Sequence, residues 1–206
     1  QLVSNWKETV EKHCNSDLAP LRPERICREL SEKMPSDTIL VSDTGHAGIW
    51  TGTMLDLKHP DQSYIRCAGS LGWGLPAALG AKCAAPDRPV LCFTGDGGIW
   101  YHIAEIETAV KENLQVVILV NNNHSLNQEK PGVESYEGKT EASDKQWLFP
   151  DADFASIAES MGATGLTVHK PSDLAGALDK AFSSKGPVVV DVKSHVDAIA
   201  PGAWLE

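Results

Sequence analysis

Short apolar segments alternate with amphipathic segments along most of this sequence. The apolar segments are β-branched and nearly continuous, which is typical of strands that are buried on both faces of a parallel sheet. Four segments have this character: residues 38–41, 90–93, 116–120 and 188–190. We therefore predict a buried, mostly parallel sheet built around these four strands.

Between the candidate strands, apolar residues recur at helical spacing. Pro23 suits the first turn of one helix, and Gly162 suits the end of another. Strands that alternate with helices of this length imply right-handed crossovers, so we predict an α/β fold with three αβα layers and a mostly parallel sheet. The helical positions are Ile26, Leu30 and Met34; Ile99, Ile103, Ile106 and Val110; Phe154, Ile157, Ala158 and Met161; and Leu174, Ala177, Leu178 and Ala181.

Three segments fall outside this alternation. Residues 1–22 are polar and charged with only a weak helical pattern, so we expect a linker-like segment that precedes a domain at 23–198. Residues 124–150 hold few aliphatic side chains, and a loop of that length is usually functional or mobile. The last two residues resemble a cloning scar, so residues 199–206 are expected to form a tail outside the domain.

The composition restricts the classes of partner. The 206 residues include 18 Lys and Arg against 28 Asp and Glu, a net charge of −10, which disfavours nucleic acid or an anionic membrane surface as the main partner. No apolar run approaches the length of a membrane span, and no secretory leader is apparent. The five cysteines contain no C-x-x-C pair and are expected to be reduced thiols. We therefore expect a cytoplasmic protein that binds neither nucleic acid nor membrane.

The motif Gly95-Asp96-Gly97-Gly98 joins the candidate strand at 90–93 to the helix that follows it. Glycines allow a sharp turn and a close approach of backbone N–H groups to an anion, and a helix N-terminus favours a phosphate. Asp96 would repel that phosphate unless a cation lay between them, which points to Mg²⁺ or Ca²⁺. The same residues also suit a plain turn.

A run of three asparagines, Asn121-Asn122-Asn123, follows the candidate strand at 116–120. The carboxyl ends of parallel strands meet at one edge of a sheet, so this run and Asp96 are expected to share that edge. Amide carbonyl oxygens are neutral ligands suited to Mg²⁺, although asparagines also occur as turn and capping residues. The pair of motifs together predicts a site for a metal and a diphosphate.

Gly95-Asp96-Gly97 followed about 25 residues later by Asn-Asn resembles the signature of thiamine-diphosphate-dependent enzymes. The segment Gly69-Ser70-Leu71-Gly72-Trp73-Gly74-Leu75-Pro76-Ala77-Ala78-Leu79-Gly80-Ala81 is similar to a second stretch of the acetolactate synthase and 2-oxoacid decarboxylase branch. The resemblance extends over residues 20–198. It implies the thiamine-diphosphate-binding fold, with thiamine diphosphate and Mg²⁺ as cofactors.

The resemblance also implies a set of site residues. The metal would be held by the Asp96 carboxylate, by Asn123 in preference to Asn122, and by the Ser125 carbonyl. Leu71 would support the bent cofactor, and the backbones of Gly69 and Leu71 would bind its pyrimidine. The complete set of implied cofactor-binding residues is Thr44, Gly45, His46, Gly69, Ser70, Leu71, Gly95, Asp96, Gly97, Gly98, Asn123, Ser125, Leu126 and Asn127.

No catalytic residue stands out, although His46 and Gln128 are candidates. In the family that the chain resembles, the activating glutamate belongs to a separate pyrimidine-binding domain. Nothing in this sequence is similar to that domain. We therefore expect the chain to be inactive alone and to need a pyrimidine-domain subunit, in an α2β2 heterotetramer, or the missing part of a longer chain.

The segment after the metal motif bears on the substrate. Acetolactate synthases usually have a Gly-Met-Val type run at 127–129, where this chain has Asn-Gln-Glu, and tend to have Met at Leu71 and His at Ala47. These departures weaken the biosynthetic role, and the polar lining suits a polar acceptor. The first hypothesis is a carboligase or lyase acting on a 2-oxoacid, and the alternative is a 2-oxoacid decarboxylase.

Two hypotheses of other classes stay open. A nucleotide- or phosphate-binding module without thiamine could use the same Gly-Asp-Gly loop, but the chain lacks G-x-x-x-x-G-K-[ST] and G-x-G-x-x-G. A non-catalytic scaffold subunit would have lost the metal site, whereas Asp96 and Asn123 are both present.

Overall fold

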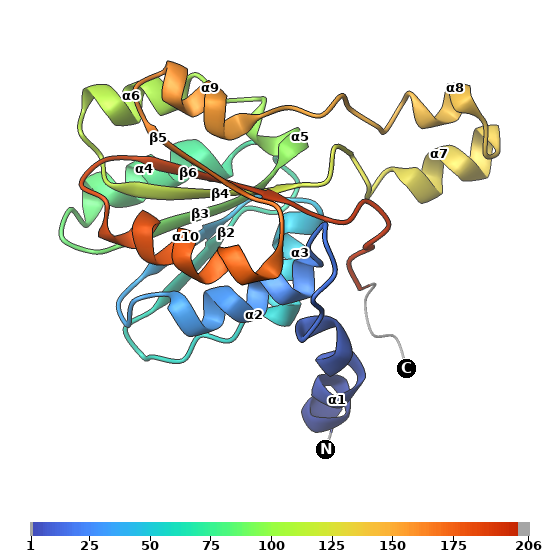
Figure 1. Cartoon of the computed structure of the whole chain (residues 1–206), viewed down its shortest axis with the longest axis horizontal. Coiled ribbons are helices and arrows are strands. Elements are labelled where there is room, and N and C mark those ends of the chain that lie inside the picture. The colour runs from blue at the N-terminus through green and yellow to red at the C-terminus, as the bar shows by residue number, and fades with distance from the viewer. Residues whose placement is uncertain (1, 202–206) are drawn as a thin grey trace.

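A computed structural model describes residues 2–201 as a six-stranded sheet covered by helices on both faces (Figure 1). The strands are all parallel and lie in the order β2-β1-β3-β4-β6-β5. This arrangement confirms the predicted three-layer α/β fold. The strands are β1 (Ile39–Ser42), β2 (Ser63–Arg66), β3 (Val90–Gly95), β4 (Val116–Asn122), β5 (Thr164–Val168) and β6 (Val188–Lys193).

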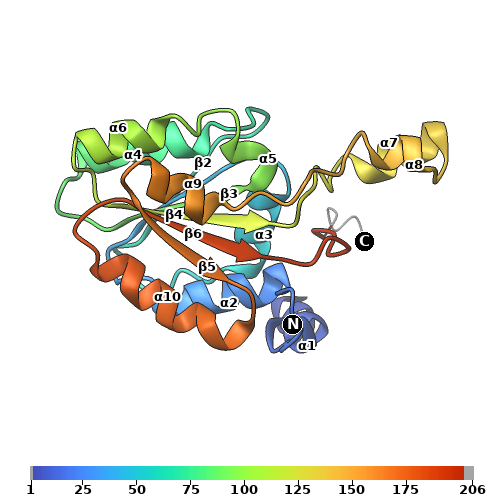
Figure 2. The same cartoon turned by 45° about the horizontal axis from the view of Figure 1, so that its top comes forward.

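The helices fall into two layers, which Figure 2 separates most clearly. Helices α4, α5, α6 and α9 cover one face, and α2, α3 and α10 cover the other. The helices are α1 (Leu2–Cys14), α2 (Pro23–Lys33), α3 (His46–Met54), α4 (Gly74–Ala84), α5 (Asp96–Ile99), α6 (Glu105–Lys111), α7 (Lys130–Glu137), α8 (Glu141–Asp144), α9 (Phe154–Ser160) and α10 (Pro171–Ser183).

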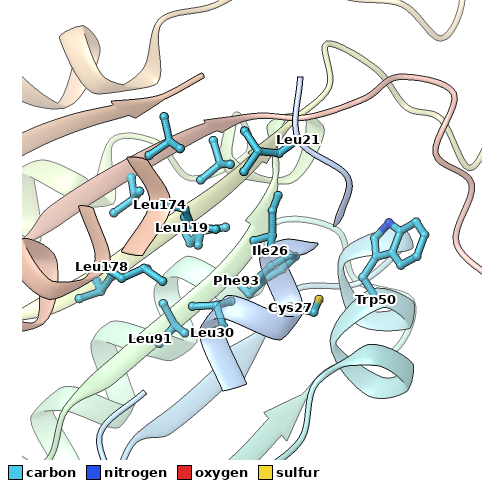
Figure 3. Close-up of a cluster of buried hydrophobic side chains, with 14 of the residues drawn as sticks. Leu21, Ile26, Cys27, Leu30, Trp50, Leu91, Phe93, Leu119, Leu174 and Leu178 are labelled. Atoms are coloured by element: carbon cyan, nitrogen blue, oxygen red, sulfur yellow. The ribbon is translucent and has the colours of Figure 1, made fainter. Parts of the chain in front are cut away.

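Each face of the sheet has its own hydrophobic core. Alternate residues of the central strands point to opposite faces, so Leu91 and Phe93 belong to one core while Val90 and Cys92 belong to the other. Figure 3 shows the first core, in which Leu91, Phe93 and Leu119 of the sheet meet residues of α2, α3 and α10. The four predicted strands are the inner ones, which explains their continuous apolar runs.

The helix expected from Ile99 to Val110 is interrupted. The structure has α5 and α6 there, separated by residues 100–104. In the interruption the N–H groups of Tyr101 and His102 bond three residues back, to Gly98 and Ile99, at 3.2 Å each. These tighter turns break the α-helical ladder, so apolar positions at helical spacing do not form one continuous helix.

The segment 1–22 is more structured than a linker-like sequence suggests. Residues Leu2–Cys14 form α1, which packs against α2, and Leu21 is fully buried and forms an isolated parallel bridge with Ser194. The domain boundary at 23–198 stays a prediction, but Leu21 belongs physically to the core. The suspected cloning scar at 205–206 lies outside the described residues.

Residues 124–150 form an arm that extends away from the sheet (Figure 1). It is not a loop throughout, as the sequence suggested, because it contains α7 and α8. No residue of α7 is buried, whereas Trp147 near the base of the arm is 4% exposed. The arm leaves and rejoins the domain at the carboxyl ends of the strands, where the predicted site lies.

Candidate functional site

A cavity of about 240 Å³ lies at the carboxyl ends of β1, β3 and β4. It brings together residues from four loops that are far apart in the sequence. All the predicted cofactor-binding residues line it except Ser70, which is exposed in the turn before α4. The lining residues are Thr44, Gly45, His46, Ala47, Gly69, Leu71, Gly95, Asp96, Gly97, Gly98, Asn121, Asn123, Ser125, Leu126, Asn127, Gln128 and Glu129.

The carboxylate of Asp96 lines this cavity, and the residue is only 4% exposed. It begins α5 directly after β3, and its two oxygens accept hydrogen bonds of 2.8 Å from the N–H groups of Gly97 and Ser125. Burial raises the pKa of Asp96 to about 7, although these backbone hydrogen bonds oppose the shift. A bound cation would stabilise the ionised carboxylate, so the site suits a metal ion.

Gly97 and Gly98 leave no room for side chains. A Cβ atom at Gly97 would lie 2.6 Å from Cδ2 of Leu126, and one at Gly98 would lie 2.6 Å from Oδ2 of Asp43. Backbone N–H groups at the start of a helix lack intrahelical partners and can bind an anion. The glycines therefore let the backbone itself form the wall of the cavity.

The three consecutive asparagines have different hydrogen-bond partners, and only two of them line the cavity. The side chain of Asn122 donates hydrogen bonds to Asp191 at 2.9 Å and to the Ala152 carbonyl at 3.0 Å, and Asn122 does not line the cavity. Asn121 and Asn123 do line it. The Asn123 Oδ1 accepts a hydrogen bond of 2.9 Å from the Ser125 hydroxyl. This arrangement favours Asn123 over Asn122 as the ligand-facing amide.

Ser125 lies where the arm leaves the domain. It forms an isolated antiparallel bridge with Leu148, on the returning part of the arm. The hydrogen bonds of this bridge are made by the flanking residues, from Leu126 N–H to Trp147 at 2.7 Å and from Phe149 N–H to His124 at 2.6 Å. The bridge therefore does not use the Ser125 carbonyl, the predicted third metal ligand.

The loop after β1 forms the opposite wall. Thr44 Oγ1 accepts a hydrogen bond of 2.9 Å from Gly69 N–H, which ties this loop to the turn before α4. Gly45 has φ +71° and lies against Gln128, whose Oε1 would be 3.2 Å from an added Cβ. Burial lowers the pKa of His46, so its imidazole is neutral at pH 7. His46 and Gln128 thus face the cavity as neutral polar groups.

Asp43 is a functional candidate that the sequence analysis missed. Its buried carboxylate accepts hydrogen bonds from Thr44 N–H at 2.8 Å, Gly72 N–H at 3.1 Å and the Thr94 hydroxyl at 2.9 Å. It therefore joins the ends of β1 and β3 to the turn that carries Leu71. A single aspartate after a strand belongs to no recognisable motif. Only the structure shows that Asp43 lies beside Gly98.

Asn121 and Glu129 line the cavity as members of the predicted asparagine run and of the predicted polar run at 127–129, although neither was assigned to the metal or the cofactor. Ala47 also lines the cavity and was not assigned to the cofactor either. For Asn121 the sequence did hold a signal, because residues two apart on a strand point to the same face as each other. Asn121 lies two positions before Asn123, the residue that directly follows β4.

The donor set of this cavity fits Mg²⁺ with a diphosphate. Within residues 2–201, no group of three or more His, Cys, Asp or Glu side chains could hold a metal. The cavity instead offers one buried carboxylate with amide and backbone oxygens, and Mg²⁺ is usually bound by one or two carboxylates together with substrate phosphates.

Across the described part of the chain, no helix is long and apolar enough to cross a membrane.

A parallel α/β sheet with a glycine-walled, carboxylate-containing cavity at its carboxyl edge is typical of proteins that bind phosphorylated ligands. The comparison with family models identifies the cofactor. Residues 43–192 match the C-terminal TPP binding domain of thiamine pyrophosphate enzymes. The chain belongs to this family, and its cofactor is thiamine diphosphate.

The relatives are larger enzymes. The chain is 31% identical over 204 residues to the acetolactate synthase large subunit of Haemophilus influenzae, covering 95% of this chain and 35% of that protein. It is 33% identical over 164 residues to the sulfoacetaldehyde acetyltransferase of Alcaligenes xylosoxydans xylosoxydans, covering 79% and 26%. The chain spans about a third of the length of the curated relatives it matches.

A solved structure shows the same fold. The thiamine diphosphate-dependent 4-hydroxybenzoylformate decarboxylase of Rhodococcus jostii RHA1 superposes with a TM-score of 0.78 at 30% sequence identity. The match covers 89% of this chain and 34% of that enzyme. The match to the family of acetolactate synthases and decarboxylases confirms the predicted resemblance.

Proposed function

We propose that this chain is the diphosphate- and Mg²⁺-binding part of a cytoplasmic, thiamine-diphosphate-dependent carboligase or lyase that acts on a 2-oxoacid. The observation that carries the proposal is the buried Asp96 carboxylate, which shares a cavity with Asn123, Ser125 and the glycine wall. Asp96, Asn123 and the Ser125 carbonyl would hold the cation. The N–H groups around Gly97 and Gly98 and the Thr44–His46 loop would hold the diphosphate.

When bound, thiamine diphosphate supplies an electron sink for cleaving and forming bonds next to a carbonyl. The chain's own residues bind and orient it. The cavity opens to solvent on one side, and the exposed Gln128 and Glu129 lie at its mouth. We propose that a pyrimidine-binding domain, on a partner subunit or in a longer chain, closes this side, excludes water and contributes the activating glutamate. An α2β2 assembly is the simplest closed arrangement of two such chains.

The names of two relatives, an acetolactate synthase and an acetyltransferase, support group transfer to an acceptor as the first candidate reaction. Decarboxylation of a 2-oxoacid is the second candidate, supported by the similarity to the 4-hydroxybenzoylformate decarboxylase. The polar residues Asn127, Gln128 and Glu129 support a polar acceptor or substrate. A thiamine-independent nucleotide-binding module is the alternative of another class.

Calorimetric titration of the chain with thiamine diphosphate tests the cofactor part of this proposal. We expect binding with Mg²⁺ present, weak binding with EDTA, and no metal-dependent binding by Asp96→Ala. ATP replaces thiamine diphosphate in a parallel titration. Metal-dependent binding of ATP but not of thiamine diphosphate would replace the proposal with the nucleotide-binding alternative.

The reaction is tested with the chain joined to its pyrimidine-binding partner, identified by co-purification from the source cells. Carboligation yields a hydroxyketone product, whereas decarboxylation alone yields an aldehyde, and a panel of 2-oxoacids separates the two. Full turnover by the chain alone would overturn the requirement for a partner.

A further inference from the structure

Asn121 is a buried polar residue near the end of an apolar strand. The five residues before it in β4, Val116 to Val120, are all aliphatic and buried. Asn121 is itself only 5% exposed and lies on the same face as Leu119, yet it lines the cofactor cavity. It therefore combines the burial of a core residue with access to the site.

The residue that pairs with Asn121 in the neighbouring strand is a glycine, which leaves space beside the Asn121 side chain. In the register of β3 and β4, Asn121 pairs with Gly95, and a Cβ added at Gly95 would meet no atom within 4 Å. Asp96 follows Gly95 directly along the chain. The Asn121 amide thus lies beside open space at the base of the cavity, one residue across from the carboxylate.

The carbonyl oxygen of this amide has no partner. Oδ1 of Asn121 is buried and accepts no hydrogen bond from the described residues. A buried acceptor without a partner destabilises the folded state, so an aliphatic residue at this position would make the ligand-free chain more stable. The amide of Asn122, one position on, is fully engaged with Asp191 and Ala152. The Oδ1 of Asn123 accepts a hydrogen bond from the Ser125 hydroxyl, so among the three consecutive asparagines only Asn121 has an unpartnered amide oxygen.

The chemistry of the neighbours indicates which ligand would satisfy it. Oxygen acceptors surround this part of the cavity, namely the Asp96 carboxylate and the amide oxygens of Asn121 and Asn123. A diphosphate offers no hydrogen-bond donor to an unpartnered carbonyl oxygen. A divalent cation, or a water molecule in its shell, does satisfy such an oxygen.

We propose that Asn121 Oδ1 is a further oxygen ligand of the divalent cation held at Asp96, directly or through one water molecule. This proposal rests on the proposed function and adds a residue to its metal site. The unpartnered Oδ1 destabilises the ligand-free chain, and the bound cation would remove this destabilisation by giving the oxygen a partner.

The test measures cation affinity without turnover. Mn²⁺ is titrated into the chain at saturating thiamine diphosphate, and free Mn²⁺ is followed by electron paramagnetic resonance. We expect Asn121→Leu to weaken Mn²⁺ binding about tenfold or more, in the range of other metal-site partners. Asn121→Asp keeps an oxygen in place and should bind Mn²⁺ at least as tightly as the unaltered chain.

Ser194→Ala is the matched control. Ser194 is 2% exposed, its Oγ is likewise buried without a partner, and it does not line the cavity. Its replacement should leave Mn²⁺ affinity unchanged. Thermal unfolding without ligands provides the second measurement, in which Asn121→Leu should unfold at the same or a higher temperature than the unaltered chain.

The outcomes are distinguishable. Mn²⁺ affinity of Asn121→Leu within twofold of the unaltered chain would overturn the proposal. Equal losses in Asn121→Leu and Asn121→Asp would also overturn it, because they would show that the amide N–H group binds the diphosphate. Absence of Mn²⁺ binding by the unaltered chain would instead reject the proposed function.

Discussion

The Asp191 carboxylate accepts a hydrogen bond of 2.9 Å from the side chain of Asn122. Asp191 is fully buried in β6, and it also accepts a hydrogen bond of 3.1 Å from Phe154 N–H and pairs with Lys193 at 3.0 Å. This contact holds Asn122 away from the cavity. Because strand residues alternate between faces, Asn121 then faces the cavity, and Asn123, directly after β4, lines it too.

Replacing Asp191 should therefore affect both stability and the metal site. We expect Asp191→Ala to lower the free energy of unfolding by about 3 kcal/mol, because Lys193 and Asn122 lose a buried partner. Mn²⁺ affinity should fall with it, and Asp191→Asn should recover part of that affinity by restoring one acceptor. Chemical denaturation and Mn²⁺ titration measure the two effects.

The exposed ion pair between Lys7 and Asp56 provides the control, with both side chains more than half exposed. Asp56→Ala should change the free energy of unfolding by less than about 1 kcal/mol. A similar small effect for Asp191→Ala would contradict a positioning role.

Gly98→Ala should damage the cofactor cavity. The added Cβ would lie 2.6 Å from Asp43 Oδ2 and 2.8 Å from Thr94 Oγ1, and both groups belong to the hydrogen-bonded base of the site. We expect a loss of about 1–3 kcal/mol in stability, with weaker binding of thiamine diphosphate. Thermal unfolding and calorimetry measure these changes.

Gly80→Ala is its control within helix α4. A Cβ at Gly80 meets no atom within 4 Å, so alanine should stabilise the helix by about 0.5–1 kcal/mol. Stabilisation by both substitutions would show that the tight packing around Gly98 is relieved easily.

Asp153 caps helix α9, and its removal should have a pH-dependent cost. Its carboxylate accepts hydrogen bonds from Ser156 N–H at 2.9 Å and the Ser156 hydroxyl at 2.7 Å, and these bonds lower the pKa of Asp153. At pH 7, Asp153→Ala should cost about 1 kcal/mol.

The sign of the pH effect follows from the lowered pKa. The stabilisation by ionised Asp153 is present above the carboxyl group's ordinary pKa and is lost as the pH falls through the lowered value. The difference in stability between the two proteins should therefore shrink in acid. Asp153→Asn, which keeps an acceptor, should show a smaller loss at pH 7. An unchanged difference down to pH 3 would contradict the role of the charge.

Asp96→Asn should stabilise the metal-free chain while preventing metal-dependent binding. Burial raises the pKa of Asp96 to about 7, so between its ordinary pKa and pH 7 the folded chain binds more protons than the unfolded chain. Stability of the unaltered chain should accordingly fall as the pH rises through this interval. The variant should lack this contribution and gain at least about 2 °C in Tm at pH 8 in metal-free buffer.

Added Mg²⁺ with thiamine diphosphate should reverse that order, because only the unaltered chain gains stability by binding them. A variant that is less stable than the unaltered chain in metal-free buffer would show that the hydrogen bonds to Asp96 outweigh its desolvation.

The central part of the fold could be predicted because its strands are buried on both faces. Strands β2 and β5 were missed, since they lie at the edges of the sheet and mix polar with apolar residues, as in Ser63–Arg66. Helices α3 and α4 are rich in glycine and alanine and lack a clear apolar stripe. Their positions depend on tertiary contacts with the sheet.

The candidate site was predicted largely from strand ends and short motifs. Asp96 and Asn123 were found because consecutive parallel strands end at a common edge. Asn121 was predicted at this edge but not as a ligand, because β4 continues to Asn122, two residues beyond the predicted end at 120. Asp43 was missed because its role depends on Gly72 and Thr94, which are distant in sequence.

The bridge between Ser125 and Leu148 makes the arm and the proposed metal site energetically dependent on each other. Ser125 belongs both to the base of the arm and to the wall of the cavity, so a displacement of the arm also displaces a proposed ligand. If a partner that binds α7 and α8 changes the affinity of the chain for the cation, the cation must change the affinity of the chain for that partner by the same factor. Assembly with the partner and binding of the cation would then be coupled, so the affinity measured for one would depend on whether the other is bound.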